Sequence, residues 1–473
     1  MTERGLAEAE SGPPAAEGPD AGPWRSRLAV LAGSTTALVT ASLAGSALGF
    51  LNKSACRAGD WNFYVKQFQA HCYTDIYPLY FGEGLSSGKV PYVDHPVEYP
   101  VLIGAAMQAV AWVVRPIADP YTRGREFFDV TVALLAVFTV AGVLATAYLA
   151  GRSRRWTALG VALAPGLVLA SFVNWDLIAM GLAMLGLAAW AARRGVLAGV
   201  LLGLAVATKF YPLLFFGPLL LLCLRAGRMR AFWVTTGSAV AAWLVVNLPV
   251  IIAAPHGWAR FYQLSSDRGA DWGSIWYFFE TERVPVVGAA GLGQLNLMSA
   301  LVFAVGSAAI AILALAAGRR PRVPQLFFLI LAVFLMSNKV WSPQYVIWLV
   351  PLVVLARPRL WSYALWQLTE VGYFFAIWAY LVSIAVSGVS FEAAGGIGTG
   401  LYFAAVIARF GAVLLLCGLV VRDIVRPGAD LVRATGEDDP AGGVLSGAPD
   451  RWTLRLRLRR AAAADGAPAT AQS

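Results

Sequence analysis

Long apolar segments alternate with short arginine clusters along most of this chain. The clusters occur at residues 25–27, 152–155, 193–194, 225–230, 319–322, 357–359 and 422–426. Cytoplasmic loops of membrane proteins are enriched in Lys and Arg, so an even number of crossings should separate each cluster from the next. Twelve helices satisfy this condition, and the pattern predicts them at 28–51, 128–150, 157–172, 175–191, 196–208, 210–224, 231–252, 296–317, 323–337, 343–356, 360–384 and 400–421.

The two ends of the chain break the apolar pattern. Residues 1–24 are rich in Ala, Gly, Glu and Pro, which predicts a disordered cytoplasmic tail. Residues 426–473 return to Gly, Ala, Pro and charged residues, and we expect a disordered basic cytoplasmic tail there. Alternating Arg and Leu at 451–460 indicate either an anchor on anionic lipid or a solubilising end. Residues 25–425 then form one transmembrane domain.

This topology places two long loops outside the membrane, at residues 52–127 and 253–295. The first loop contains an apolar run at 99–114 that is borderline in length for a crossing. Counting it as a crossing would move the arginines at 152–155 outside, so we interpret it as a helix in the outer interface. A full crossing with a broken charge pattern is the alternative.

Three hairpins of short helices are predicted to carry polar turns, at 174–176, 208–212 and 338–344. A helix of about 13–17 residues spans only about 20–25 Å at 1.5 Å per residue. That length falls short of a hydrocarbon core about 30 Å thick, so the turns should lie below the outer membrane surface. Irregular backbone is tolerated at that depth only against protein or in a water-filled cavity. We expect the first outer loop to cover such a cavity.

Composition agrees with this pattern and excludes several function classes. Of 473 residues, 58% are hydrophobic and only 14% are charged, which is typical of a polytopic membrane protein. The net charge of +10 comes from arginines placed between apolar segments, and we therefore expect no nucleic-acid partner. The sequence contains no Walker loop, no dinucleotide fingerprint and no zinc-type Cys/His spacing, so we expect neither a soluble nucleotide site nor a metal site.

Several motifs together resemble a known family. They are Gly-Lys-Val-Pro-Tyr-Val-Asp-His-Pro-Val-Glu-Tyr-Pro at 88–100, Asn-Trp-Asp at 174–176, Lys-Phe-Tyr-Pro at 209–212, Ser-Asn-Lys at 337–339 and Ser-Pro-Gln-Tyr at 342–345. Their order and spacing resemble glycosyltransferase family 87, within the GT-C class of polytopic mannosyltransferase-like enzymes. Val101 departs from the pattern, since many relatives have a second proline there.

The resemblance implies an all-α, GT-C-like fold with interfacial helices in the first outer loop. It also implies a hexosyltransferase that takes a sugar, with mannose expected, from a polyprenyl-phosphate donor and needs no cofactor. The acceptor would be an extracytoplasmic glycan or glycolipid, and the protein would lie in a bacterial-type plasma membrane with its active site on the outer face. A site outside the cell has no nucleotide supply, which agrees with a lipid-linked donor.

The chemistry requires a carboxylate base for the acceptor hydroxyl. In GT-C enzymes an acidic residue of the first outer loop has this role, and Asp60 matches by position, with Tyr64 close behind it to bind a sugar face. The alternative for Asp60 is a helix N-cap. Asp94 and Glu98 are competing candidates for the base. Either could instead orient the acceptor, or hold Lys209 or Lys339 by ion pairing.

Other polar residues in the predicted turns are candidates for substrate binding. Lys209 and Lys339 are expected to contact the donor phosphate, unless they merely extend to the outer surface. The remaining candidates for binding sugar hydroxyls, or for positioning a lysine, are Asn174, Asp176, Tyr99, Gln344 and His256.

Two structural pairings also follow from the topology. Cys56 and Cys72 share the first outer loop on the oxidising side, where either a disulfide or two free thiols would be expected. Glu370 and Arg409 lie about ten residues into neighbouring helices of opposite direction, so their depths match and we expect an ion pair.

Two other function classes remain open at this level. A transporter or flippase of lipid-linked sugars would also suit polar turns within the membrane. A non-catalytic subunit of an envelope-assembly complex would require Asp60 to be dispensable.

Overall fold

The computed structural model describes residues 23–285, 287–386, 390 and 392–454, except for the side chains of residues 23–32 and 60. The chain divides into two compact units, residues 1–37 and 38–473. Of the first unit, the described part is the beginning of α1 (Pro23–Arg57). Secondary structure across the described residues is helical, apart from one isolated bridge between Pro91 and His95. The expectation of an all-α polytopic membrane protein is therefore confirmed at this level.

Six helices in the described part of the chain are long and apolar enough to cross a membrane. They are Gly33–Arg57 within α1, α5 (Pro120–Leu149), α11 (Met229–Ala253), α14 (Leu292–Ala316), α17 (Leu360–Ala385) and α18 (Thr399–Val425). α11 and α14 expose much apolar surface, such as Val245 at 74% and Val305 at 70%. Exposed apolar surface of this extent is expected for helices that contact lipid.

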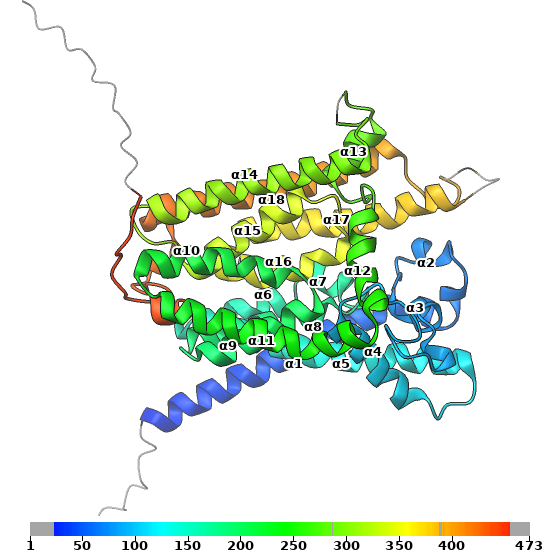
Figure 1. Ribbon diagram of the computed structural model, residues 1–473, viewed down its shortest axis with the longest axis horizontal. Coiled ribbons are helices and arrows are strands. Elements are labelled where there is room, and N and C mark those ends of the chain that lie inside the picture. Colours follow the sequence, from blue (N-terminus) through cyan, green and yellow to red (C-terminus); the bar gives the residue numbers. More distant parts are fainter. Residues whose placement is uncertain (1–22, 286, 387–389, 391, 455–473) are drawn as a thin grey trace, which may run out of the picture. The chain divides into compact units, whose positions relative to one another are not determined.

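Shorter apolar helices occupy most of the other predicted positions. They are α4 (Val101–Val114), α8 (Asp176–Ala191), α9 (Gly195–Thr208), α10 (Phe216–Ala226) after the turn η4 (Tyr211–Phe215), α15 (Val323–Ser337), and α16 (Val346–Ala356) after η5 (Pro343–Tyr345). These helices pack side by side with the long ones, as Figure 1 shows for α8, α9, α10 and α15. That each short helix crosses the membrane, and that 99–114 lies in the interface, stay predictions.

One predicted helix is wrong. Instead of a continuous helix over 157–172, the chain forms η3 (Arg152–Ala158), α6 (Leu159–Ala162) and α7 (Pro165–Ala170). Pro165 lacks a backbone N–H and clashes with the preceding turn, so the helix stops before it and a new one starts with Pro165 at its first turn. The sequence pattern of apolar residues did not reveal this break.

The two predicted outer loops meet at one end of the helices of residues 38–473. The first contains η1 (Asp60–Asn62), α2 (Lys66–Gln69), α3 (Ile76–Gly82) and η2 (Leu85–Ser87), and the second contains α12 (Pro255–Asp267) and α13 (Ile275–Thr281). In Figure 1, α12 runs across the direction of α11 and α14 at the same end as α2 and α3. A Cβ atom on Gly257 would lie 2.0 Å from the carbonyl oxygen of Tyr92, so glycine permits this close contact between the loops.

Two predicted pairings within this unit are present. Cys56 and Cys72 form a disulfide, with their Cα atoms 5.9 Å apart. In the bundle, the Arg409 Nε atom lies 2.9 Å from a carboxylate oxygen of Glu370, and both side chains are almost fully buried. Arg409 also donates to the carbonyl oxygen of Trp341 at 3.0 Å, which ties α18 to the turn before α16.

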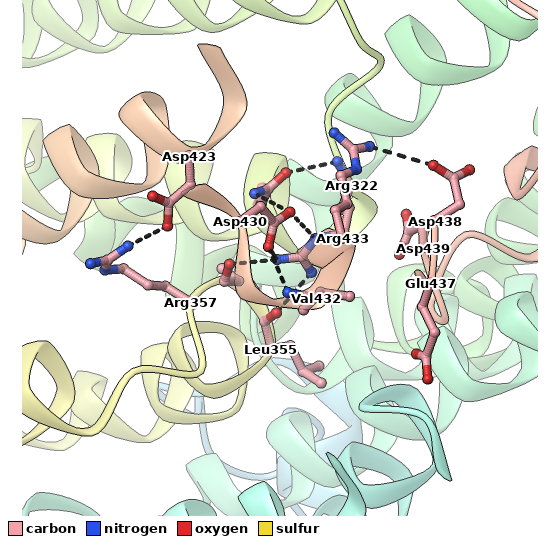
Figure 2. Close-up of polar contacts among 12 residues, drawn as sticks. Arg322, Leu355, Arg357, Asp423, Asp430, Val432, Arg433, Glu437, Asp438 and Asp439 are labelled. Atoms are coloured by element: carbon pink, nitrogen blue, oxygen red, sulfur yellow. Dashed lines mark hydrogen bonds and ion pairs between the residues drawn. The ribbon is translucent and has the colours of Figure 1, made fainter. Parts of the chain in front are cut away.

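At the other end of the bundle, the chain after α18 forms a strap, which we define as residues 427–454 (Figure 2). It contains η6 (Pro427–Ala429), α19 (Leu431–Ala434) and η7 (Gly443–Leu445). Its acidic side chains pair with arginines of the turns between helices, in the pairs Arg154–Glu437, Arg225–Asp450, Arg319–Asp438, Arg320–Asp450 and Arg322–Asp430.

The strap corrects the prediction of a disordered basic tail from residue 426 onward. Residues 427–454 carry five acidic residues and only two arginines, so this part of the tail is acidic. Its carboxylates are held in place by arginines that lie more than 100 residues earlier in the chain, which sequence pattern alone does not reveal. Residues 1–22 and 455–473, including most of the alternating Arg and Leu end, lie outside the described residues.

Candidate active site

A cavity of about 610 Å³ lies beneath the two outer loops. Its lining comes from the first outer loop, from α12 and the residues that follow it, from the polar turns at 174, 209–211 and 338–345, and from α17. The cavity is therefore built where the predicted hairpin turns meet the predicted loops. This size is typical of a small-molecule binding site.

Lys209 and Asp176 form a buried ion pair at this site. The Lys209 Nζ atom lies 2.7 Å from Asp176 Oδ1, and it also lies 4.9 Å from the ring centroid of Tyr99. The backbone N–H of Asp176 donates to Asn174 Oδ1 at 3.0 Å, so the 174–176 turn is closed by its own asparagine. Because α9 ends at Thr208 with Lys209 in an extended conformation, the lysine leaves the helix axis and reaches the start of α8.

Trp348 contacts this ion pair, and two tyrosine rings stack on Trp348. The indole N–H of Trp348 donates to Asp176 Oδ2 at 3.1 Å. Trp348 stacks with Tyr345 at a centroid distance of 3.8 Å and with Tyr211 at 4.6 Å. Asp176 therefore has partners on both carboxylate oxygens, and the stacked rings hold one of those partners in place.

A second carboxylate, Asp75, lines the cavity from the first outer loop. It accepts hydrogen bonds from the Tyr73 hydroxyl at 2.6 Å and from the Tyr99 hydroxyl at 3.1 Å. The backbone N–H of Asp75 donates to the carbonyl oxygen of Val173 at 2.7 Å, which attaches the loop to the 174–176 turn. Burial raises the pKa of Asp75, while the two tyrosine hydroxyls and Lys209 act in the opposite direction.

Two cationic side chains, Lys339 and Arg268, also line the cavity. The Lys339 ammonium donates to the backbone carbonyl oxygen of Ser266 at 2.8 Å. No carboxylate of the described residues lies within ion-pair distance of Lys339. Asp271 is close by, where its backbone N–H donates to the carbonyl oxygen of Lys339 at 2.8 Å and its side chain accepts from Ser342 at 3.3 Å. Burial raises the pKa of the Asp271 carboxyl.

The structure brings most of the predicted site residues together. The predicted residues that line the cavity are Tyr64, Glu98, Tyr99, Asn174, Lys209, Lys339 and Gln344, and Asp176 joins them through its pair with Lys209.

Two predicted candidates lie elsewhere. Asp94 is exposed and accepts a hydrogen bond from the Val90 backbone N–H at 2.9 Å, which closes a turn of the loop. His256 is exposed in the first turn of α12 and is not part of the cavity lining. Asp60 begins η1, but its side chain lies outside the described residues.

Sequence reasoning missed three charged lining residues, Asp75, Arg268 and Asp271. Asp75 lies in a loop rich in polar and aromatic residues, where no periodicity distinguishes one carboxylate from another. Its position beside Tyr73, before the short apolar helix α3, was the available signal. Among the described residues, no group of three or more His, Cys, Asp or Glu side chains is arranged to hold a metal ion.

Comparison with known proteins agrees with this geometry. No curated protein matches the chain. The sequence model of Glycosyltransferase family 87 matches residues 111–343. This stretch includes the turns that contain Asn174, Asp176, Lys209 and Lys339. It does not include the part of the first outer loop that precedes residue 111. Residues 111–343 therefore form a glycosyltransferase family 87 domain, and the members of this family are GT-C-like membrane glycosyltransferases.

Proposed function

We propose that this membrane glycosyltransferase moves mannose from a polyprenyl-phosphate donor to a glycan or glycolipid on the outer face of a bacterial plasma membrane. The observation that carries the proposal is a single cavity that combines a carboxylate of the first outer loop with Lys339 of a polar turn and Arg268 of the second outer loop. A transferase that uses a lipid phosphate needs both, one for the acceptor proton and one for the leaving group.

Lys339 and Arg268 are the residues that we assign to the donor phosphate. Lys339 bonds a neutral carbonyl group, so its charge remains available for an anion. Lys209, the other expected phosphate ligand, already contacts Asp176 at 2.7 Å. A cation paired in this way has less attraction for a second anion, and we assign Lys209 to holding Asp176 and Tyr99 in position. Asp176 and Asn174 then form the polar floor of the donor site.

The base is proposed to be a carboxylate of the first outer loop. Asp75 is the candidate whose described side chain lines the cavity, and burial raises its pKa, which strengthens it as a base once it is deprotonated. Asp60 remains the candidate that the sequence predicts, and Glu98, exposed at the cavity lining, suits a role in orienting the acceptor.

The reaction follows from these positions. The base removes a proton from the acceptor hydroxyl, and the hydroxyl oxygen forms a bond to C1 of the donor sugar. The bond between C1 and the phosphate oxygen breaks, and polyprenyl monophosphate leaves. The negative charge that grows on this phosphate is stabilised by the fixed cations, which is where oriented charge lowers a barrier most.

The test is transfer by the purified protein in lipid nanodiscs. Radiolabelled polyprenyl-phospho-mannose and a cell-envelope glycolipid extract are the substrates, and labelled glycolipid is the expected product. Lys339→Met should reduce transfer strongly, whereas Glu282→Gln, an exposed carboxylate of the second outer loop, should not. Absence of any labelled product with the wild-type protein, for several sugars on the same carrier, would contradict the proposed donor class.

A further inference from the structure

One part of the cavity lining is aromatic and comes from the first outer loop and α17. Phe68 of the first outer loop stacks on Trp378 of α17 at a centroid distance of 5.9 Å, with the two rings 7° from parallel. Tyr73 stacks on the same indole at 4.7 Å. α2 packs against α17, so these contacts join the outer loop to a membrane helix. All three rings line the cavity.

Tyr64 completes this group and is the ring that remains free. Its ring meets Phe68 edge-on at 5.1 Å, and the residue is 65% exposed. Phe68 and Trp378 are only 3% exposed, so they are fixed by packing and support the free ring from behind. We call Tyr64, Phe68, Tyr73 and Trp378 the aromatic wall. An exposed tyrosine on a rigid aromatic backing is a surface prepared for a flat apolar partner.

The aromatic wall is connected directly to Asp75, the proposed base. The Tyr73 hydroxyl donates to Asp75 Oδ1 at 2.6 Å, so the last ring of the wall adjoins the carboxylate. The other aromatic group of the cavity differs, because Trp348 is stacked by Tyr345 and Tyr211 and donates to Asp176. Protein side chains thus already contact both the ring and the N–H of the Trp348 indole.

We propose that the aromatic wall is the acceptor subsite, where Tyr64 stacks on a pyranose ring of the acceptor. This proposal rests on the proposed function, and it adds the residues that bind the acceptor and their place in the cavity. A pyranose has an apolar face of C–H groups and an edge of hydroxyl groups. Its face matches the exposed ring of Tyr64, and its edge matches the polar end of the wall at Tyr73 and Asp75.

The other occupants fit the wall less well. A purely apolar chain would bring no hydroxyl group to the Asp75 carboxylate, although that carboxylate lines the same cavity. A phosphate belongs with Lys339 and Arg268, which come from other elements of the fold. A sugar on the wall, in contrast, brings one hydroxyl to the base while the donor phosphate lies at the cations.

The experiment compares two synthetic acceptors with synthetic polyprenyl-phospho-mannose as the donor. Octyl α-D-mannopyranoside should accept mannose, and 1-octanol, which has the chain and a hydroxyl but no sugar ring, should not. Tyr64→Ala should raise KM for octyl mannoside by about 2- to 12-fold, the range for loss of one aromatic contact, and leave KM for the donor unchanged. Tyr64→Phe retains the ring and should restore the wild-type KM.

Tyr121→Ala is the matched control, since Tyr121 is an exposed tyrosine of the same outer region that does not line the cavity. Binding of octyl mannoside, followed by saturation-transfer NMR in nanodiscs, gives a second measurement that does not need turnover. Loss of this binding in Tyr64→Ala but not in Tyr121→Ala supports the proposal.

Equal acceptor KM and equal binding in the Tyr64→Ala variant would overturn it, as would efficient transfer to 1-octanol. An effect of Tyr64→Ala on the donor KM alone would overturn it too, because the wall would then hold the donor. If the wild type binds octyl mannoside through Tyr64 but uses no polyprenyl-phosphate donor, the proposed function fails and the sugar site stands.

Discussion

Replacing Asp430 with asparagine should destabilise the protein through the strap, far from the cavity. Asp430 is 1% exposed and accepts two hydrogen bonds from the Arg322 guanidinium, at 2.7 and 3.0 Å (Figure 2). Arg322 also donates to the carbonyl oxygens of Leu355 and Ala356 at the end of α16. The arginine is therefore held between the strap and two helices, and only 1% of it is exposed.

The magnitude follows from what the substitution leaves behind. Removing one partner of a buried ion pair costs about 3–5 kcal/mol, because the remaining charge is buried without compensation. The lower value applies here, since two carbonyl groups still bind Arg322. The unfolding entropy is about 2.1 cal/mol/K per residue, so for 473 residues each kcal/mol shifts the melting temperature by about 1 °C. A loss of about 3 kcal/mol therefore corresponds to a fall of roughly 3 °C.

The assay is thermal unfolding of the detergent-purified protein, followed by fluorescence-detected size exclusion. Glu126→Gln is the control, because Glu126 and Arg57 form a partly exposed pair at 3.9 Å, which should contribute only about 0–1 kcal/mol. Asp430→Leu combined with Arg322→Met should be milder than Asp430→Asn alone, since no charge is left buried. A melting temperature for Asp430→Asn within about 1 °C of the control would refute the reasoning that the strap is held by this pair.

Four further predictions concern the bundle and the cavity. Changing Glu370 to Gln, or Arg409 to Met, should each lower the melting temperature more than the double change does, and equal values for all three would argue against the ion pair. Asp75→Asn should keep donor binding but lose about 10²–10⁴ in transfer rate, and near-normal turnover would move the base to Asp60. Burial raises the pKa of Asp75, and a base must be deprotonated to act. As the pH falls, kcat/KM should therefore fall with a midpoint above the pKa of an ordinary aspartate, and a midpoint near about 4 would contradict this. Lys339→Met should raise the donor KM, with Lys339→Arg restoring it in part; an unchanged donor titration would remove Lys339 from the phosphate site.

Hydrophobic pattern was sufficient to locate most of the helices, because a helix satisfies its own backbone hydrogen bonds within one short segment. The structure has α15 at Val323–Ser337, as the pattern predicts, and α8 and α9 begin and end within one residue of the predicted positions. Lys209, Asn174 and Lys339 interrupt apolar hairpins, and this pattern likewise predicted that they line one cavity. Polar groups below the membrane surface need protein partners or a water-filled cavity. The Glu370–Arg409 ion pair could also be predicted from the sequence, because the rise per residue of a helix sets how deep each side chain lies in the membrane.

Irregular segments were beyond that reasoning, because their backbone follows no period and their side chains are placed by contacts made far along the chain. Asp75 could not be distinguished from the other acids of its loop until its backbone was seen bonded to Val173, and the docking of the strap depended on Arg322, 108 residues before Asp430. The break at Pro165 shows the same limit on a smaller scale, since the apolar pattern continues through it. Sequence thus determined which segments form helices and which polar residues must share a cavity. The tertiary structure decided which carboxylate and which cations remain free there, because a charge becomes available or occupied only through the partners that packing brings beside it.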